Sequence, residues 1–297
     1  MNDKPKILVI VGPTASGKTS LSIQLAKKFN GEIISADSRQ VYQGLDLGTG
    51  KVTNEEMQGI PHHLLDVTDP QDSYTVADYV KDGRQAITDI LSRNKLPIIV
   101  GGTFFYIDAL LGKISAPEVL PNEALRTKLE VLTNEELFEL LKQKDVKRAE
   151  TIDKDNPRRL IRALEIIDAI GVVPESKSEE LYDALTLGMT TTKEELQRNI
   201  HMRLVERLEK GMIEEVANLH KNGLSYELMS DRGIEYKYIV EYLQDKITKE
   251  KMCELIETKS VQYAKRQMTW LKRDADIVWV GPSEIEEVEG VVRGFLK

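Results

Sequence analysis

The sequence has almost no cysteine, no long apolar run and no surplus of positive charge. Cys253 is the only cysteine among 297 residues, which excludes an internal disulfide and a zinc site built on cysteines. No apolar stretch approaches the roughly 20 residues that a membrane-spanning helix needs. A signal peptide is not expected, because the first apolar run is short and a glycine-rich loop follows it at once. These absences predict a cytoplasmic protein.

The formal net charge is −8, from 41 lysines and arginines against 49 aspartates and glutamates. This acidic balance argues against a protein whose whole surface binds nucleic acid, but it leaves room for local basic patches. The proportions of 41% hydrophobic and 30% charged residues are those of a globular protein that can bury a full core. The distribution of charge along the chain therefore matters more than its sum.

A phosphate-binding loop near the N-terminus is the clearest motif. Residues 7–11 form an apolar run with the length and β-branched composition of a buried strand. Residues 12–19 then match G-x-x-x-x-G-K-[ST], and apolar residues at helical spacing follow. Backbone amides and a helix N-terminus in this order suit an anion, to which Lys18 adds a cation and Thr19 a hydroxyl ligand for Mg²⁺. The loop, which predicts binding of a di- or triphosphate, comprises Gly12, Pro13, Thr14, Ala15, Ser16, Gly17, Lys18 and Thr19.

The patterns predict an α/β fold, with a P-loop NTPase-like parallel sheet as its core, a helical insertion and a helical C-terminal half. Further buried strands are expected at 32–36, 63–67, 97–100, 185–189 and 277–280. Capping signals at Asn122, Thr133, Asn156 and Thr192 predict helix starts after the first third of the chain. We divide the chain into a first part of the core at 1–116, a mainly helical insertion at 117–181, and a return to the core with further helices at 182–297.

Polar residues follow two of the predicted strands. Asp37-Ser38-Arg39-Gln40 comes after the second strand, at the sheet edge where ligands of parallel α/β folds bind. The strand at 97–100 ends in Gly101-Gly102-Thr103, and not in the aspartate that is usual in motor ATPases and GTPases. Asp37 is thus the only strand-end carboxylate near the loop, and it can be a metal-shell residue, a general base or a simple turn residue. Thr103 can equally be the N-cap of the next helix.

Two basic clusters stand out against the acidic background. Residues 154–162 contain Lys154, Arg158, Arg159 and Arg162, with Asp155 as the one acid. Residues 259–273 contain no acid, and Lys265, Arg266, Thr269 and Arg273 share a helical face there, with Tyr263 and Trp270 interleaved. Such a stripe suits a phosphate backbone with stacked bases, although a solvated helix face is the simpler interpretation of either cluster.

A set of longer motifs runs in order along nearly the whole chain. They are Gly-Pro-Thr-Ala-Ser-Gly-Lys-Thr at 12–19, Ile-Ser-Ala-Asp-Ser-Arg-Gln-Val-Tyr at 34–42, Pro-His-His-Leu at 61–64, Gly-Gly-Thr-Phe-Phe-Tyr at 101–106, Asn-Pro-Arg-Arg-Leu-Ile-Arg-Ala-Leu-Glu at 156–165, Gly-Ile-Glu-Tyr-Lys at 233–237 and Tyr-Ala-Lys-Arg-Gln-Met-Thr-Trp-Leu at 263–271. In this combination the chain resembles the bacterial-type tRNA dimethylallyltransferases, also called tRNA isopentenyltransferases. It departs from the family at Phe104 and Glu235, where glycine is common.

The resemblance implies transfer of a dimethylallyl group from dimethylallyl diphosphate to N6 of the adenosine 3′-adjacent to the anticodon in tRNA, with release of diphosphate. The loop at 12–19 would then hold the diphosphate, and Lys18 and a Mg²⁺ ion on Thr19 would stabilise the charge that develops on it. Asp37 would take the proton from the amine. The residues implied to contact the anticodon stem-loop are Asp37, Ser38, Arg39, Gln40, Thr103, Arg126, Arg158, Arg159, Arg162, Lys265 and Arg266.

Three alternatives share parts of this pattern. A free-nucleotide isopentenyltransferase uses the same donor with a smaller acceptor, and a P-loop small-molecule kinase would bind ATP in the same loop. A nucleotide-triggered RNA-binding switch would be no enzyme at all. We expect a monomer that binds tRNA and dimethylallyl diphosphate. No membrane partner is expected.

Overall fold

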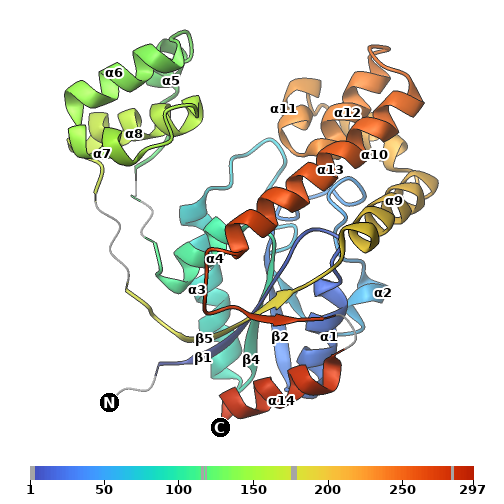
Figure 1. Cartoon of the computed structure of the whole chain (residues 1–297). Coiled ribbons are helices and arrows are strands. Elements are labelled where there is room, and N and C mark those ends of the chain that lie inside the picture. The colour runs from blue at the N-terminus through green and yellow to red at the C-terminus, as the bar shows by residue number, and fades with distance from the viewer. Residues whose placement is uncertain (1–3, 115–116, 118, 175–178, 282–283) are drawn as a thin grey trace. The chain divides into compact units, whose positions relative to one another are not determined.

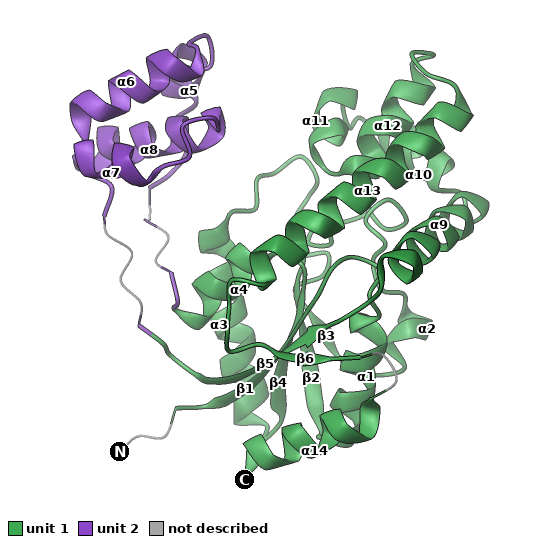
Figure 2. Cartoon of the chain, in the orientation of Figure 1, with its two compact units in different colours: residues 1–112, 180–297 green, residues 113–179 purple. Residues whose placement is uncertain are grey.

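The computed structural model describes residues 4–114, 117, 119–174, 179–281 and 284–297 (Figure 1). The chain divides into two compact units, one formed by residues 1–112 and 180–297 and the other by residues 113–179 (Figure 2). The sequence placed the insertion at 117–181, and its limit at residue 116 lies outside the described residues. None of the described helices is long and apolar enough to cross a membrane.

The larger unit is built on a six-stranded parallel sheet with the strand order β3-β2-β4-β1-β5-β6. The strands are β1 (Lys6–Val11), β2 (Gly31–Ala36), β3 (His62–His63), β4 (Leu96–Gly101), β5 (Asp183–Met189) and β6 (Val278–Val280). The predicted α/β fold with a parallel sheet is confirmed. The strand expected at 63–67 is wrong beyond His63, because Leu64 and Asp66 have φ values of 64° and 54° that an extended strand cannot contain.

Helices cover both faces of the sheet, as the side-chain alternation of β1 requires. Ile7, Val9 and Val11 pack with α3 (Val76–Ser92) and α4 (Phe104–Leu111) on one face. Leu8 and Ile10 pack with α1 (Lys18–Lys28) and α14 (Ile285–Leu296) on the other. Since both faces are buried, the polar residues that follow β1, β2 and β4 are gathered at the carboxyl edge of the sheet.

The C-terminal helical group of this unit has a core of its own. The group comprises α9 (Lys193–Glu209), α10 (Met212–Lys221), α11 (Tyr226–Asp231), α12 (Ile234–Leu243) and α13 (Lys249–Leu271). The short α2 (Asn54–Met57) has no buried residue. The core of this group takes in Val41, Tyr42 and Leu45 from the segment after β2. At its other end α13 reaches the sheet, where Leu271 packs in the same cluster as residues of α4 (Figure 1). The helical group is therefore anchored to the carboxyl edge of the sheet.

The smaller unit is helical, as the sequence predicts. It contains α5 (Glu123–Leu129), α6 (Asn134–Lys144), α7 (Val146–Thr151) and α8 (Pro157–Ile170) around a core that includes Leu137, Leu141 and Leu160. The expected caps are confirmed: Asn122 accepts from the Leu125 amide, Thr133 and Glu136 form a capping box, and Asn156 caps α8 with Pro157 in its first turn. In the larger unit, Thr192 and Glu195 form the predicted capping box of α9.

A buried ion-pair network supports one side of the sheet. The Glu32 side chain on β2 is only 1% exposed, and its carboxylate contacts Arg93, Lys95 Nζ at 2.7 Å and His63 Nε2 at 2.8 Å. Hydrogen bonding from Arg93 outweighs the desolvation of Glu32 and holds the pKa of its carboxyl well below the usual range. A single carboxylate thus joins β2, β3 and the α3–β4 connection.

Replacing Glu32 by glutamine is expected to lower the free energy of unfolding by about 1.5–3 kcal/mol at pH 7, because Arg93 and Lys95 lose the charged acceptor that the buried carboxylate provides. A carboxyl with a depressed native pKa stabilises the fold above about pH 4.5, its ordinary value, and loses that contribution as pH falls further. Urea unfolding at pH 7 and pH 4 should therefore show a smaller pH effect in Glu32→Gln than in the wild type. Asp89→Asn, which alters the exposed partner of Arg93, should change stability by less than about 0.5 kcal/mol.

Candidate active site

The loop between β1 and α1 has the geometry of an anion site. Ala15 and Gly17 have φ values of 60° and 92°, and a Cβ on Gly12 would lie 2.9 Å from both Met189 Cβ and Ser16 Oγ. Within the described part of the chain, the backbone amides of residues 15–19 donate to no protein acceptor. Free amides at the start of α1 are available to a bound anion, which the helix dipole also favours.

Two hydroxyl groups of the loop are also without protein partners. The Ser16 side chain is buried, and its Oγ has no hydrogen-bond partner among the described residues. Thr19 is exposed, and no described residue hydrogen-bonds to its hydroxyl group. A buried, unpaired oxygen beside free amides is the kind of group that a bound ligand satisfies. The residues present therefore fit a phosphate group with a Mg²⁺ ion held through Thr19.

Lys18 supplies the cation of the loop. Its Nζ donates to the Pro13 carbonyl at 2.6 Å, so the side chain folds back over the loop. Burial lowers the pKa of Lys18 from 10.5 to about 8; the positive charge of Arg203 on α9 acts in the same direction, and the negative charge of Asp37 opposes it. Lys18 is therefore a cation held in an unfavourable environment until an anion is bound.

This lowered pKa predicts a pH dependence of anion binding. In the free protein Lys18 loses its proton as pH rises through about 8, whereas a bound diphosphate favours the protonated form. We expect the affinity for pyrophosphate at constant Mg²⁺ to fall between pH 7.5 and 9.5, as measured by isothermal titration calorimetry. The Lys18→Arg variant keeps its charge over this range, so its pH dependence shows the effect of pyrophosphate ionisation alone. Equal pH slopes for both proteins would contradict the prediction.

Asp37 lies at the carboxyl end of β2, on the same edge as the loop. Its Oδ1 accepts from the Arg39 amide at 2.8 Å, and its charge acts on Lys18. Thr103 stands at the N-cap position of α4 but does not cap the helix with its side chain. Instead, Thr103 Oγ1 accepts from the Ser38 amide at 3.1 Å, and the Thr103 amide donates to the Ala36 carbonyl at 3.1 Å. The structure thus brings Asp37, Ser38 and Thr103 together, and the N-cap interpretation of Thr103 is wrong for its hydroxyl.

The next residues connect this loop to the helical group. Gln40 Nε2 donates to the Gly50 carbonyl at 3.3 Å, while Arg39 is exposed. The Glu215 carboxylate on α10 accepts from the amides of residues 46–48 and from the Tyr236 hydroxyl at 2.7 Å. The segment 44–51 is therefore fixed to the C-terminal helices at one end and to Gln40 at the other.

Both departures from the family pattern are accommodated inside helices. Phe104 is 8% exposed, opens α4 and packs into the core between that helix and the sheet. Glu235 lies in the first turn of α12, and its Oε1 forms an ion pair with Arg207 Nη2 at 3.1 Å. Arg207 also donates to the carbonyls of Leu47 and Gly48.

The exposed face of α13 is basic and aromatic. Tyr263 and Trp270 are 38% and 39% exposed, and the guanidinium groups of Arg266 and Arg273 lie 5.7 Å and 5.6 Å from the respective ring centroids. Lys265 is exposed as well. Burial raises the pKa of the Tyr263 hydroxyl, and the negative charge of Asp37 acts in the same direction. The face has the composition that single-stranded nucleic acid requires.

Two polar residues of the helical group were missed by the sequence argument. Gln267 on α13 accepts from the Thr14 amide at 2.9 Å, and Asn199 on α9 donates to the Ala15 carbonyl at 3.1 Å. Gln267 lies inside the motif at 263–271, in which only the charged and aromatic residues suggested a function. On a helical projection Gln267 lies on the same face as Ala264 and Leu271, which are both buried. This spacing could have indicated that Gln267 is buried as well.

The arginines of the insertion belong to the smaller unit and differ in what they contact. Arg126 Nε pairs with Oε1 of Glu165, a carboxylate with 0% side-chain exposure, at 2.8 Å. Arg162 donates to the Val119 carbonyl at 2.7 Å and also contacts Glu165. Arg158 and Arg159 are exposed. Arg126 and Arg162 thus have a structural role in their own unit, and the tRNA contacts of all four residues stay predictions.

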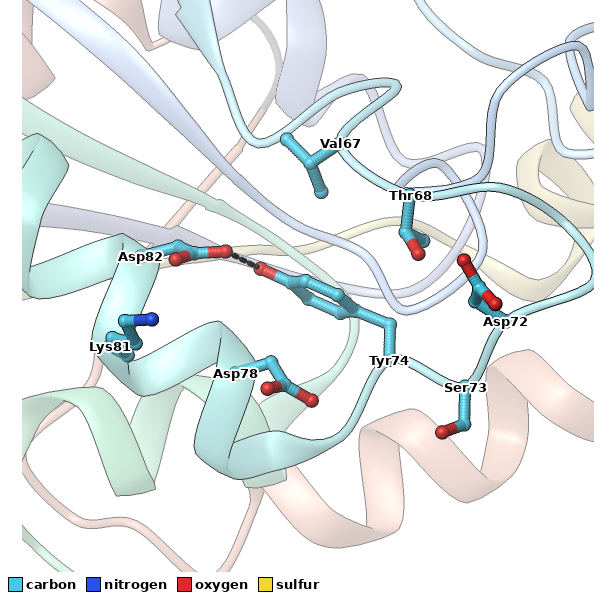
Figure 3. A pocket seen from close by; sticks show the side chains of 8 residues that line it. All are labelled: Val67, Thr68, Asp72, Ser73, Tyr74, Asp78, Lys81 and Asp82. Carbon is cyan, nitrogen blue, oxygen red and sulfur yellow. Dashed lines mark hydrogen bonds between the residues drawn. The ribbon is translucent and has the colours of Figure 1, made fainter.

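A separate cavity of about 370 Å³ opens beside the start of α3 (Figure 3). It is lined by Val67, Thr68, Asp72, Ser73, Tyr74, Asp78, Lys81 and Asp82. The Tyr74 hydroxyl donates to Asp82 at 2.9 Å, and Asp78 caps α3 through Thr75. Its carboxylates make it unsuitable for a diphosphate, and no residue of the loop at 12–19 lines it.

Fold and site together define an α/β protein of the P-loop NTPase-like class, with the loop at 12–19 and the strand-end carboxylate of Asp37 at the same edge of the sheet. The family model described as IPP transferase matches residues 40–274. A tRNA dimethylallyltransferase of Anoxybacillus flavithermus is 42% identical over 279 residues, which cover 92% of this chain and 89% of that protein. One from Bacillus mycoides is 40% identical, with 98% and 94% covered.

Solved structures of tRNA-modifying transferases are also similar to this chain. The tRNA isopentenylpyrophosphate transferase of Bacillus halodurans has a TM-score of 0.76 at 37% identity, covering 99% of this chain and 97% of that one. A eukaryotic dimethylallyltransferase, described as acting on tRNA, has a TM-score of 0.80 at 30% identity, covering 95% and 75%. The chain therefore belongs to the IPP transferase family.

Proposed function

We propose that this chain transfers a dimethylallyl group from dimethylallyl diphosphate to N6 of the adenosine 3′-adjacent to the anticodon of tRNA, releasing diphosphate. The relatives named for this activity support the reaction class. The observation that carries the proposal is the pairing of two features at one sheet edge: a loop of unpaired amides with Lys18, and the Asp37 carboxylate beside it.

The loop stabilises the leaving group. As the allylic C–O bond breaks, its electron pair moves to the diphosphate. The amides of residues 15–19, which have no acceptor among the described residues, and the Lys18 ammonium group can stabilise the negative charge that develops there. Mg²⁺ bound through Thr19 would add positive charge at the same oxygens. Because Lys18 is charged only at a cost in the free protein, its attraction to the developing charge is strong.

Asp37 completes the reaction at the acceptor. The N6 amine forms the new C–N bond to the allylic carbon and loses one proton, for which Asp37 is the nearby base. An adenosine inside a stacked loop must leave the stack to reach this carboxylate. Ser38 and Thr103, which are joined by a hydrogen bond, would contact that nucleotide together with Arg39 and Gln40.

The basic face of α13 and the exposed insertion arginines are proposed to hold the RNA backbone. Charge reversal at Arg266 or Arg159 should weaken binding of the anticodon stem-loop and reduce the slope of log K against log salt by about 0.7–0.9 per lost contact. Fluorescence anisotropy between 50 and 300 mM KCl measures both quantities. Lys249→Glu, at the far end of α13, is the matched control. Unchanged slopes would remove these residues from the interface.

One assay separates the proposed function from its alternatives. The protein is incubated with Mg²⁺, labelled dimethylallyl diphosphate and either unmodified tRNA or free adenosine phosphates. Label in tRNA at the position 3′ to the anticodon supports the proposal, and label in free nucleotides identifies the smaller-acceptor enzyme. Phosphoryl transfer from ATP identifies a kinase, and nucleotide-dependent RNA binding without any transfer identifies the switch.

We also propose that the protein acts as a monomer in the cytoplasm. The donor loop, Asp37 and the basic face of α13 all come from one compact unit of a single chain. The single cysteine suits a reducing compartment. Size-exclusion chromatography with light scattering tests the first part.

A further inference from the structure

Gln267 is a buried polar residue that the proposed chemistry does not use. It is 5% exposed, although it lies only one residue from the exposed Arg266 on α13. Its Oε1 accepts from the Thr14 amide at 2.9 Å, and its Nε2 donates to the Gly102 carbonyl at 3.1 Å. The two ends of one side-chain amide are thus committed to two loops that are far apart in the sequence.

The packing around Gln267 leaves little freedom. A Cβ on Gly102 would lie 2.3 Å from Gln267 Nε2, so the contact requires a residue without a side chain at position 102. One turn earlier on α13, Ala264 is fully buried in a cluster that includes Ala15 of the loop. Asn199 holds the Ala15 carbonyl from α9. The loop at 12–19 is therefore held in place by contacts with α13 and α9 of the C-terminal helical group.

The two loops that Gln267 joins serve the two halves of the reaction. Thr14 belongs to the loop proposed to hold the diphosphate. Gly102 precedes Thr103, whose hydroxyl accepts from the Ser38 amide next to Asp37. Any change in the separation of these loops alters the distance between the leaving group and the base, to which such reactions are sensitive.

We propose that Gln267 is a positioning residue that sets the spacing between the donor loop and the Asp37 loop. It does so through α13, the helix whose other face is basic and aromatic. By accepting from the Thr14 amide, Gln267 also fixes the turn at Ala15 that leaves the following amides free for an anion. The proposal rests on the proposed function for the identity of the donor, whereas the hydrogen bonds do not depend on it.

The test is the Gln267→Met variant, which keeps the length of the side chain and removes both hydrogen bonds. We expect pyrophosphate affinity to fall about tenfold and kcat to fall with it, while affinity for the anticodon stem-loop stays within twofold. Gln262→Met changes an exposed glutamine of the same helix and should leave all three quantities unchanged. Melting temperatures of both variants establish that they are folded, and a purely structural role would lower the melting temperature without separating donor from RNA affinity.

A second variant tests the contact itself. Gly102→Ala should lower pyrophosphate affinity about tenfold in the wild type, because the new Cβ displaces Gln267 Nε2. The same change should add little in a Gln267→Ala background, where the side chain no longer reaches residue 102, so the two effects are non-additive. Additive effects, or pyrophosphate affinity in Gln267→Met within twofold of the Gln262→Met control, would overturn the proposal. If the wild type transfers no prenyl group but pyrophosphate binding still depends on Gln267, the proposed function fails and the positioning role stands.

Discussion

Asp37→Asn is expected to lower kcat for prenyl transfer by about 10²–10⁴-fold, the usual contribution of a positioned general base. Asparagine keeps the size of the side chain, and its Oδ1 can still accept from the Arg39 amide, so the loop geometry should survive. What is lost is the ability to take the N6 proton as the C–N bond forms. Affinities for tRNA and pyrophosphate should stay within a few-fold of the wild type. Single-turnover kinetics with saturating labelled donor measure the effect without interference from product release.

Asp46→Asn provides the matched control for this substitution. Asp46 is an exposed aspartate of a nearby loop, paired with Lys51, and it has no place in the proposed chemistry. Its replacement should leave kcat within about twofold of the wild type, because Lys51 keeps its ion pair with Asp66 and its hydrogen bond to the Tyr42 carbonyl. Near-normal turnover in Asp37→Asn would remove the base assignment. An equal loss in tRNA affinity and in turnover would instead make Asp37 a binding residue.

Most of the parallel sheet could be predicted from local sequence, because each buried strand is a short β-branched run followed by glycine or polar residues. The strand predicted at 63–67 is wrong beyond His63, because Leu64 is apolar like a strand residue but takes a left-handed backbone conformation. The loop at 12–19 and the strand-end position of Asp37 could also be predicted, because each lies in a contiguous motif. The role of Asp37 as a base came only from the family resemblance and stays a prediction.

The rest of the site could not be predicted, because it depends on contacts between residues far apart in the sequence. Gln267 and Thr14 are separated by 253 positions, and nothing in either neighbourhood indicates the other. The hydroxyl of Thr103 bonds to Ser38, 65 positions away, although its local context favoured a helix cap. Likewise, nothing in the sequence around Arg126 or Arg162 indicates that both pair with the buried Glu165.

Lys18→Met is expected to lower kcat/KM for dimethylallyl diphosphate by about 10²–10³-fold, comparable to the loss of one preorganised group that stabilises developing charge. The same substitution should not lower the melting temperature. Burial already disfavours the charged form of Lys18, as its pKa of about 8 shows, so removing the charge relieves a cost to the folded state. Differential scanning fluorimetry and initial-rate kinetics on one preparation measure both effects.

Lys27→Met is the control for Lys18→Met, because Lys27 is an exposed lysine of the same helix whose Nζ donates to Gln58. It should change neither rate nor melting temperature appreciably. Loss of activity with equal or higher stability in Lys18→Met would mean that the protein maintains an unfavourable charge for the sake of the leaving group. If activity and stability fell together, Lys18 would instead be needed to hold the loop, through its hydrogen bond to the Pro13 carbonyl. The sign of the change in melting temperature therefore distinguishes a catalytic cation from a structural one.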